Sequence, residues 1–514
     1  MQKGLTMFTR IMSAAIVGMD VIPVQVEADV SDGLPHFTMV GFVSSQVKEA
    51  GDRVRTALKN IGSALPPKRI TINLSPADVP KSGSGFDLPV ALGMLAAMEI
   101  FSPESLTGIM AVGELSLSGE INPVAGILPS AMKAREIGVS TMLVPRANLG
   151  EARLVDGLTV IGCASLPEVI DFLRDGVRPE DRLSREEQEI NSYTVDFSEI
   201  RGQDGVKRAA AISAAGFHNL LMIGPPGSGK TMIAKRIPTI MPPLTRDESL
   251  DITKIYSIAG LLSPDSPIMG TRPFRSPHHT MSPQALAGGG RIPKPGEITL
   301  AHRGILFLDE MPEFSRGSLE ILRQPLEDRE IIIARQAGTF RFPADFLLLA
   351  AMNPCPCGYF PDRSRCKCTP LEINSYLNRI SQPLLDRIDL CVECPAVSID
   401  ELTPVTPSGR SSHEIRKEVM KAAAIQKARY QDTGFHFNSE IPSSRIGEFC
   451  PMEESAGIFL RKAYDRLGLT ARSYFRIIRV ARTIADLAGS DLILKEHVSE
   501  AVSYRTVDKK YRAV

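Results

Sequence analysis

The feature that most constrains this chain is a glycine-rich segment of eight residues near its middle. The segment reads GPPGSGKT, follows the short apolar run 220–223, and precedes a stretch at 232–237 with helical character. It satisfies the pattern G-x-x-x-x-G-K-[ST] between a strand and a helix. Glycines let the backbone curl so that successive N–H groups point inward, where they bind phosphate oxygens. The segment therefore predicts a nucleotide phosphate site made by Gly224, Pro225, Pro226, Gly227, Ser228, Gly229, Lys230 and Thr231.

A second apolar run, at 304–308, adds acidic residues to this expected site. A continuous apolar run is typical of a strand buried on both faces, and this one ends in Asp309 and Glu310. We expect Lys230 to reach the β- and γ-phosphates, and the helix after the loop to offer its positive N-terminal end. Thr231 and Asp309 suit Mg²⁺ coordination, and Glu310 suits polarising the attacking water. The combination predicts binding and hydrolysis of Mg-ATP.

A third apolar run, at 346–351, ends in Met352 and Asn353. Taken alone, an Asn at the end of a strand is more often a turn former. With the other two strands present, its spacing is similar to that of the first sensor of AAA+ ATPases. We therefore expect Asn353 to hold the lytic water or to contact the γ-phosphate.

The 514 residues divide at two changes of composition. Ten of the sixteen residues in 174–189 are charged, and 396–412 is rich in Pro, Ser and Thr. This predicts three domains, at 1–175, 190–395 and 410–514. The first alternates strand-like and helix-like runs, which indicates α/β or α+β packing, whereas the last has helical periodicity almost throughout.

Composition limits the partners and the compartment. Lys plus Arg and Asp plus Glu both number 59, so contact with nucleic acid would depend on local basic loops. No apolar stretch approaches the roughly 20 residues that span a bilayer. The apolar stretch 12–19 continues into an alternating segment and is interpreted as a strand, not a leader. The eight cysteines form no evident secretory framework, so we expect a cytoplasmic protein without a membrane partner.

Further motifs surround the three apolar runs. They are RPFRSPHHT at 272–280, GGG at 288–290, PGE at 295–297, AH before GILFLDE at 301–310, AAMNPCPCG at 350–358 and LLDRID at 384–389. With them, nearly the whole chain resembles the ComM/YifB family of magnesium-chelatase-like AAA+ ATPases. The resemblance implies an α/β AAA+ P-loop ATPase core with a C-terminal helical lid domain. It also implies a homo-oligomeric ring, usually a hexamer, with each ATP between neighbouring subunits.

Such a ring implies that an arginine from a neighbour completes the site by neutralising charge in the transition state. The best match to this arginine is Arg387 in LLDRIDL, with Arg379 second. The second sensor falls in TARSY, which gives Arg472, with Arg476 as the alternative. The structural alternative for these arginines is an ion pair on the surface or on a helix face.

Two segments are candidates for contact with a substrate. The segment 330–342 has the pattern of a hairpin with its turn near 336–338, and the resemblance directs it towards the ring pore. Arg335 near the tip could grip a phosphate, although a plain surface hairpin is the alternative. The segment 258–303 is too long for an idle connection, and the resemblance implies an inserted hairpin-like element there. His278 and His279 within it lack a suitably spaced third metal ligand, so they are interpreted as loop structure or substrate contacts.

The family resemblance implies DNA branch migration during recombination of incoming single strands. It therefore predicts a DNA translocase or helicase, with single-stranded or branched DNA and recombination proteins as partners. No basic platform rich in aromatic residues supports this independently, and Trp is absent. A protein-remodelling ATPase and a magnesium-chelatase motor subunit are the alternatives.

Four cysteines, Cys355, Cys357, Cys366 and Cys368, form two C-x-C pairs separated by eight residues. Four thiolates within fourteen residues can close a tetrahedral, structural Zn²⁺ site, although C-x₂-C is the more typical spacing. Free thiols and a labile disulfide are the alternatives. Cys391 and Cys394 are rival ligands.

The first 170 residues resemble the protease domain of Lon, which has an α+β fold like that of domain 2 of ribosomal protein S5. The resemblance rests on 80–85 (PKSGSG), 113–119 and 123–127. In Lon a lysine activates a serine nucleophile, but the alignment puts Gly85 at the serine position and Leu128 at the lysine position. Ser82, Ser84, Lys81 and Lys133 lie nearby without matching either position. The interpretation is a non-catalytic module for oligomerisation or DNA binding, and not a protease.

Overall fold

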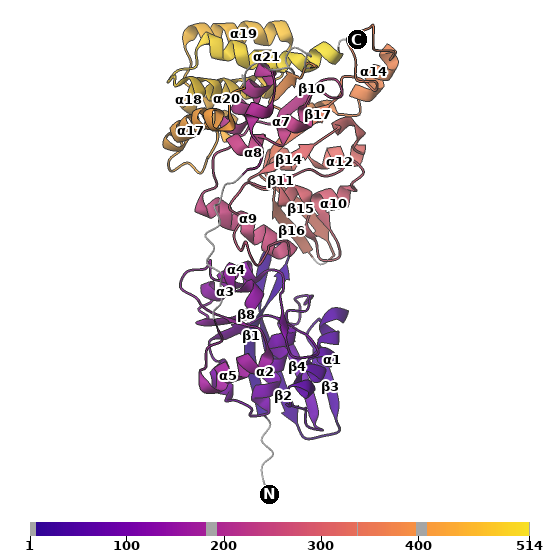
Figure 1. The fold of residues 1–514 in the computed structure, drawn as a ribbon, viewed down its shortest axis with the longest axis vertical. Helices are drawn as coiled ribbons and strands as arrows, with labels where there is room; N and C mark the ends of the chain where they lie inside the picture. The colour runs from indigo at the N-terminus through magenta and orange to yellow at the C-terminus, as the bar shows by residue number, and fades with distance from the viewer. Residues whose placement is uncertain (1–6, 181–192, 337, 397–408, 513–514) are drawn as a thin grey trace.

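A computed structural model describes residues 7–180, 193–336, 338–396 and 409–512. The molecule is elongated, with an N-terminal domain at one end and helices of the C-terminal region at the other (Figure 1). The phosphate-loop domain lies between them. Much of the two predicted connections falls on 181–192 and 397–408, which lie outside the described residues.

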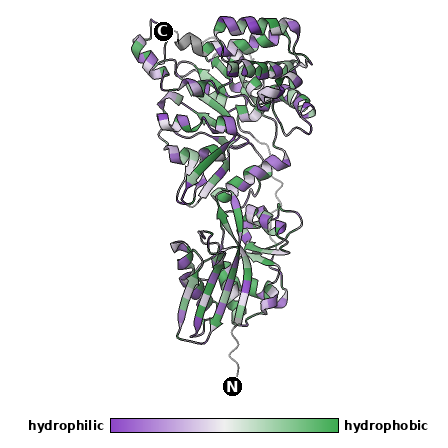
Figure 2. Cartoon of the chain, turned by 180° about the vertical axis from the view of Figure 1, so that it is seen from behind, coloured by the Kyte–Doolittle hydropathy of each residue, from purple (hydrophilic) through white to green (hydrophobic). Residues whose placement is uncertain are grey.

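The N-terminal domain is built on one mixed sheet of seven strands in the order β3-β4-β2-β1-β5-β8-β9. Its strands are β1 (Met7–Val17), β2 (Asp20–Ser31), β3 (His36–Val40), β4 (Arg69–Ser75), β5 (Ile109–Ala111), β8 (Thr141–Pro145) and β9 (Thr159–Cys163). Buried and partly exposed residues alternate along β2 and β4. Hydrophobic and hydrophilic residues also alternate along strands of this domain (Figure 2). The apolar stretch that the sequence interprets as a strand belongs to β1.

Helices cover this sheet. They are α1 (Ser45–Asn60), α2 (Asp87–Ala97), α3 (Ile127–Glu136), α4 (Leu149–Ala152) and α5 (Leu166–Asp175). Every residue of α2 is buried, because its apolar sequence packs against β1, β2 and α1. The domain is therefore an α+β unit with its own core.

The phosphate-loop domain has a parallel five-stranded sheet in the order β11-β14-β17-β10-β18. The strands are β10 (Leu220–Ile223), β11 (Phe274–Arg275), β14 (Ile305–Leu308), β17 (Leu347–Met352) and β18 (Leu390–Glu393). The three central strands are buried at every residue, which agrees with their uninterrupted apolar sequences. Since the strands are parallel, their carboxyl ends meet at one edge.

The helix after the phosphate loop differs from the sequence-based expectation of one helix across 232–237. It consists of α7 (Lys230–Ala234), followed by a separate short helix, α8 (Ile237–Ile240). Pro238 has no N–H to donate to the carbonyl of Ala234, so a continuous helix loses a hydrogen bond there. The expected helix stopped just before this proline, but the chain already leaves the helix at 235–236.

The C-terminal region is helical, as predicted. Its longer helices are α17 (Ser412–Arg429), α19 (Glu454–Leu467), α20 (Ala471–Ala488) and α21 (Lys495–Arg512). On α20 the apolar residues Ile477, Ala481 and Ile484 recur at helical spacing and are buried, whereas Ala488 at the end of the helix is exposed. None of the helices in the described ranges combines the length and the apolar character needed to cross a membrane.

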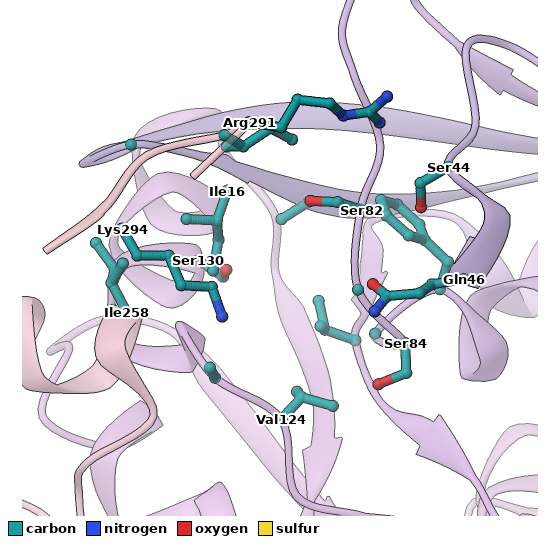
Figure 3. A pocket seen from close by; sticks show the side chains of 18 of the residues that line it. Ile16, Ser44, Gln46, Ser82, Ser84, Val124, Ser130, Ile258, Arg291 and Lys294 are labelled. Atoms are coloured by element: carbon teal, nitrogen blue, oxygen red, sulfur yellow. The ribbon is translucent and has the colours of Figure 1, made fainter. Parts of the chain in front are cut away.

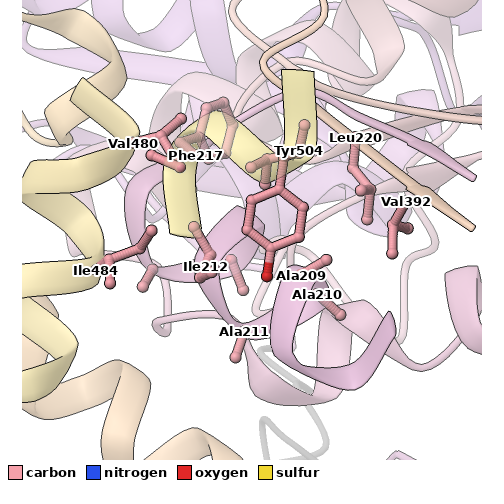
Figure 4. Packing of buried hydrophobic residues seen from close by; sticks show 14 of the residues in the cluster. Ala209, Ala210, Ala211, Ile212, Phe217, Leu220, Val392, Val480, Ile484 and Tyr504 are labelled. Carbon is pink, nitrogen blue, oxygen red and sulfur yellow. The ribbon is translucent and has the colours of Figure 1, made fainter. Parts of the chain in front are cut away.

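The helical region shares a core with the phosphate-loop domain. Helix α6 (Asp204–Gly216) contributes Ile212, which lies in one cluster with Ile484 of α20 and Tyr504 of α21 (Figure 4). Burial of such side chains contributes on the order of 2 kcal/mol each, so this contact is a stable junction. The region is fixed to the strand that leads into the phosphate loop, because α6 directly precedes β10.

The N-terminal domain also contacts the phosphate-loop domain. The turn between β1 and β2 packs Val17 and Met19 against the apolar cluster that contains Phe340. A Cβ added to Gly18 would lie 2.8 Å from Cδ1 of that ring, so the turn approaches it closely. Beside this contact, Ser257 of α9 (Arg246–Ala259) donates its hydroxyl to the carboxylate of Glu151 at 2.6 Å.

Candidate active site

The phosphate loop requires glycine for two different reasons. Gly227 and Gly229 have φ values of +76° and +81°, a region that side chains disfavour, and no other atom lies near the place of their missing Cβ. At Gly224 the reason is space, because an added Cβ would lie 2.2 Å from the carbonyl oxygen of Cys394. The start of the loop therefore needs glycine because space is short, and its later positions need glycine because the backbone is left-handed there.

Lys230 lies at the centre of the expected site. Its side chain is largely buried, and its ammonium donates to the carbonyl oxygens of Gly224 at 2.7 Å and Pro225 at 2.9 Å. It also donates to Oδ1 of Asn353 at 3.2 Å, which brings the expected sensor residue to the loop. Burial lowers the pKa of Lys230 below its ordinary value, although nearby acidic groups oppose the effect.

Thr231 and Asp309 meet as a pair suited to Mg²⁺. The hydroxyl of Thr231 donates to Oδ2 of Asp309 at 2.6 Å, and Oδ1 of Asp309 accepts from the backbone N–H of Glu310 at 3.0 Å. Hydroxyl and carboxylate oxygens are the ligands that Mg²⁺ prefers, so this donor set fits the ion. The side chain of Glu310 remains 58% exposed, which leaves it accessible to water.

His279, which the sequence analysis interpreted as loop structure or a substrate contact, lies beside Glu310. Its Nδ1 lies 3.8 Å from Oε2 of Glu310, and its ring lies beside that of His278 with 4.2 Å between the centroids. Strand β11 pairs in parallel with β14, so the segments that follow the two strands emerge at the same edge. The motif at 272–280 contained this strand, but its two-residue length gave no recognisable strand pattern.

The structure brings two of the predicted arginines together at one carboxylate. Arg387 and Arg472 pair with the two oxygens of Glu327, at 2.7 Å and 2.6 Å. The side chain of Arg387 is only 7% exposed, whereas that of Arg472 is 49% exposed. Glu327 lies on α13 (Pro325–Asp328) and was not singled out from the sequence. The roles of both arginines in a ring stay predictions.

The two alternative arginines have other partners. Arg379 pairs with Glu313 at 2.8 Å and keeps half of its side chain exposed. Arg476 is largely buried and pairs with Asp389 at 2.6 Å. Of these two, Arg379 is the more exposed, and the partner of Arg476 ties α20 to the residue just before β18.

The predicted hairpin is present as β15 (Glu330–Arg335) and β16 (Gly338–Pro343), paired in antiparallel register. The guanidinium of Arg335 donates to the carbonyl of Gly290 at 3.4 Å. Gly290 belongs to a second hairpin, β12 (Gly288–Gly289) and β13 (Lys294–Pro295), within the segment for which an inserted element was expected. The tips of the two hairpins therefore lie together.

Arg291 is a second arginine at these tips that the sequence did not single out. Arg291 and Arg335 both line a cavity of about 530 Å³, whose other side is formed by Phe42 and Asp78 of the N-terminal domain. Both arginines are exposed, so they form a small basic surface. They are more than forty residues apart in the sequence, and they come together because the tips of the two hairpins are in contact.

A cavity of about 640 Å³ lies between the N-terminal domain and the second hairpin (Figure 3). Ser82 and Ser84 line it from one side, and Arg291 and Lys294 from the other. Neither lysine of the N-terminal domain that lies near the Lon-like motifs lines this cavity. Lys81 is buried and donates to the carbonyl of Pro76, and Lys133 pairs with Glu136 on the surface at 2.7 Å.

The residues aligned with the Lon dyad offer no nucleophile or base. Gly85 has no side chain, and Leu128 is buried in α3. A peptidase of this type needs a lysine beside a serine. The geometry around Ser84 is therefore consistent with the prediction of a non-catalytic domain, which stays a prediction.

The four clustered cysteines converge at one point. Their sulfur atoms all lie within 4.8 Å of one another, and the group does not include Cys391 or Cys394. Cys355 and Cys366 are buried, whereas Cys357 and Cys368 are partly exposed. The predicted ligand set is thus assembled beside Asn353.

Comparison with known proteins matches most of the chain to one family. Residues 196–402 match the family "Magnesium chelatase, subunit ChlI", and residues 409–505 match its C-terminal part. Residues 26–148 match "Subunit ChlI of Mg-chelatase". The protein YifB of Escherichia coli K12 is 42% identical over 96% of both chains.

Two further proteins are similar to this chain, one over nearly its whole length and one over a part of it. Competence protein ComM of Haemophilus influenzae is 41% identical over 96% of this chain and 97% of its own length. Lon protease 2 of Bacillus subtilis is 26% identical, but over only 29% of this chain and 27% of its own length. The similarity to Lon is therefore confined to one part of each protein.

Proposed function

The chain belongs to the ComM/YifB family of magnesium-chelatase-like AAA+ ATPases, and we propose that it is a ring-forming motor that moves along DNA. The single observation that carries the ATPase part is the convergence of Lys230, Thr231, Asp309 and Asn353 at one sheet edge. The DNA part rests on the family and on the two arginine-bearing hairpins.

Each residue at the sheet edge has a defined task in hydrolysis. Lys230 neutralises charge on the transferred phosphate, and its ammonium exchanges its carbonyl partners for phosphate oxygens. Mg²⁺, held by Thr231 and Asp309, supplies further positive charge when bound. Glu310 accepts a proton from the attacking water or orients it, and Asn353 holds that water or the γ-phosphate.

The oligomeric part of the proposal concerns Arg387 and Arg472. In a homo-oligomeric ring, a hexamer by family resemblance, Arg387 of one subunit completes the ATP site of its neighbour. Arg472 senses the same nucleotide from the lid. Their shared carboxylate, Glu327, offers a resting position from which either arginine is released. This arrangement supports a coupling between nucleotide state and the position of α20.

The proposed DNA contact is the pair of hairpin tips. Arg291 and Arg335 are exposed and adjacent, and arginine forms strong hydrogen bonds with phosphate. A contact of this kind tracks the backbone of single-stranded or branched DNA without reading its sequence. The name of the Haemophilus relative, competence protein, agrees with a role in recombination of incoming DNA, in which recombination proteins are the expected partners.

The proposal is tested by steady-state ATP hydrolysis with and without single-stranded and forked DNA. Lys230→Ala serves as the blank, because it removes the ammonium at the phosphate site. We expect DNA to stimulate hydrolysis several-fold and Arg335→Ala to lose the stimulation. Arg341→Ala is the matched control, since Arg341 is exposed on the same hairpin but pairs with Glu330 at 2.7 Å. Stimulation that persists in Arg335→Ala would remove the hairpin from the proposal.

A second candidate is a motor subunit of a magnesium chelatase. The 38 kDa magnesium-chelatase subunit of Rhodobacter capsulatus is 21% identical over 60% of this chain and 85% of its own length. Hydrolysis that is indifferent to every form of DNA would favour this candidate or a protein-remodelling ATPase. It would leave the proposed ATP site intact.

A further inference from the structure

The four cysteines form a built site shortly after β17, the strand that leads to Asn353. The sulfur of Cys355 lies 3.4 Å from that of Cys357 and 3.8 Å from that of Cys366, and the last two sulfurs are 3.6 Å apart. Cys368 completes a group in which all four sulfurs lie within 4.8 Å. We propose that these four thiolates hold one zinc ion.

The distances discriminate between the chemical alternatives. A zinc ion about 2.3 Å from four tetrahedral sulfurs keeps them about 3.8 Å apart, close to the spacing found here. A disulfide needs about 2.05 Å between two sulfurs, and all four thiols are free. An iron–sulfur cluster, whose irons are bridged by sulfide, spreads its thiolates over a larger volume than a single ion does. The geometry points to one tetrahedral ion.

The surroundings of the sulfurs also suit a charged zinc–thiolate centre. The sulfur of Cys355 accepts the backbone N–H of Phe360 at 3.4 Å, the kind of outer contact that orients metal ligands. Four thiolates around Zn²⁺ carry net negative charge. Arg363, Arg365 and Lys367, which are exposed in the same loop, supply the opposite charge. Arg363 donates to the carbonyl of Cys368 at 3.3 Å.

The cysteine loop rests on the phosphate loop. Gly358, between the two C-x-C pairs, has a φ of +85°, and a Cβ there would lie 2.4 Å from Cδ of Pro226. The first cysteine follows Asn353 by two residues, and Asn353 accepts from Lys230. An ion that fixes the cysteine loop therefore fixes both the sensor residue and one side of the phosphate loop. The zinc ion thus supports ATP binding without touching the nucleotide, an inference that rests on the proposed ATP site.

The metal is tested first, independently of ATP. Zinc would be measured by mass spectrometry in the full chain purified without chelator. We expect about one zinc per chain, and a loss of most of it in the double variant Cys357→Ser with Cys368→Ser. Both of these cysteines are partly exposed, which limits damage to the core. Cys163→Ala is the control, since Cys163 is buried in the N-terminal domain, and it should retain the ion.

A second measurement uses the unaltered chain, so it does not depend on the folding of a variant. Protein produced with Co²⁺ in place of Zn²⁺ should show the visible and near-ultraviolet absorption of a tetrahedral cobalt–thiolate centre. A chain that carries neither zinc nor cobalt would overturn the site. Equal zinc in the double variant and in the unaltered chain would overturn the assignment to these cysteines.

The coupling to ATP is tested by the affinity for a fluorescent ATP analogue. We expect the double cysteine variant to bind it about tenfold more weakly, a change of about 1.4 kcal/mol. Lys230→Ala should keep its zinc and lose nucleotide binding. Unchanged affinity in a zinc-free variant would overturn the coupling alone. Tight nucleotide binding by Lys230→Ala would instead overturn the proposed ATP site and leave the zinc site standing.

Discussion

At the scale of the residue, Gly358 has two reasons to be glycine, its left-handed backbone conformation and the closeness of Pro226. Gly358→Ala puts a methyl group both in a left-handed backbone region and against the ring of Pro226. We expect it to weaken ATP binding by about tenfold through the phosphate loop. The measurement is the dissociation constant of an ATP analogue.

Gly434→Ala provides the matched control for this prediction. Gly434 has a φ of +76°, but nothing lies near the place of its Cβ. It should cost about 1 kcal/mol of stability and leave ATP affinity unchanged. Equal effects of the two substitutions on affinity would contradict the contact with Pro226.

The residues predicted from the sequence are those whose signal is local. The loop glycines, Lys230, Asp309 and Asn353 each lie in or directly after a recognisable apolar strand, and the parallel sheet brings those strand ends together. His279 follows a strand of only two residues, so nothing local indicated its approach to Glu310. Glu327 joins Arg387 to Arg472 across sixty or more positions in the sequence, a contact that depends on how the C-terminal helical region packs.

At the scale of the element, buried charge fixes α20 within the helical region. Asp486 pairs with Arg429 at 2.5 Å and with Arg482 at 3.0 Å, and it accepts from the amide of Asn438 at 2.8 Å. The side chains of Asp486 and Arg482 are fully buried. A buried charge that loses its partner is strongly destabilising. Arg429 and Arg482 both have the carboxylate of Asp486 as their partner.

Removal of that carboxylate should therefore be costly. We expect Asp486→Ala to lower the free energy of unfolding by about 3–5 kcal/mol, measured by urea denaturation. Asp465→Ala on α19 is the control, because Asp465 is exposed, and it should change stability by less than about 0.5 kcal/mol. A loss of similar size in both variants would contradict the role of the network.

A buried histidine between α6 and α20 makes this junction sensitive to acid. His218 is fully buried, and its Nε2 lies 2.7 Å from the hydroxyl of Thr483. Burial lowers the pKa of His218 to about 4, although Asp389 opposes the effect. The unfolded chain, with a histidine pKa near 6.5, then binds a proton that the folded chain does not. Stability is therefore full above about pH 6.5 and falls as the pH decreases towards 4.

This prediction is checked by melting temperatures between pH 7.5 and pH 4.5. The unaltered chain should lose stability across this range, and His218→Gln should lose less, since one titrating group is gone. His302 shifts in the same direction, with burial lowering its pKa to about 4, so some dependence remains in the variant. Parallel curves for the two proteins would contradict the assignment to His218.

At the scale of the whole molecule, the β1–β2 turn joins two domains that the sequence treated separately. Val17 and Met19 belong to an apolar stretch that was interpreted as part of a strand, and nothing in it indicated contact with Phe340. Strand and helix patterns predicted the interior of each domain well, because each core is made by elements with regular periodicity. The contact between the two domains depends on a few side chains at a turn. Hydrophobic periodicity predicts helices and strands, so it does not identify such side chains.

The contact between the N-terminal domain and the phosphate-loop domain can be tested in the full chain. Met19→Asp places a charge against the apolar cluster beneath α9 and β16, so we expect faster hydrogen exchange in both elements. Leu34→Asp is the control in the same domain, since Leu34 is 89% exposed. Exchange that stays unchanged in Met19→Asp would show that the turn contributes little to the contact.

The contact between the β1–β2 turn and the phosphate-loop domain has a mechanical consequence. Because the N-terminal domain contacts the phosphate-loop domain at this turn, a rotation of the phosphate-loop domain would also turn the N-terminal domain. The long axis of the molecule makes that domain a lever arm, so a small angular step beside the phosphate loop becomes a wide sweep at the far end of the sheet (Figure 1). A ligand bound at that far end would then move farther than the hairpin tips, which lie where the two domains meet.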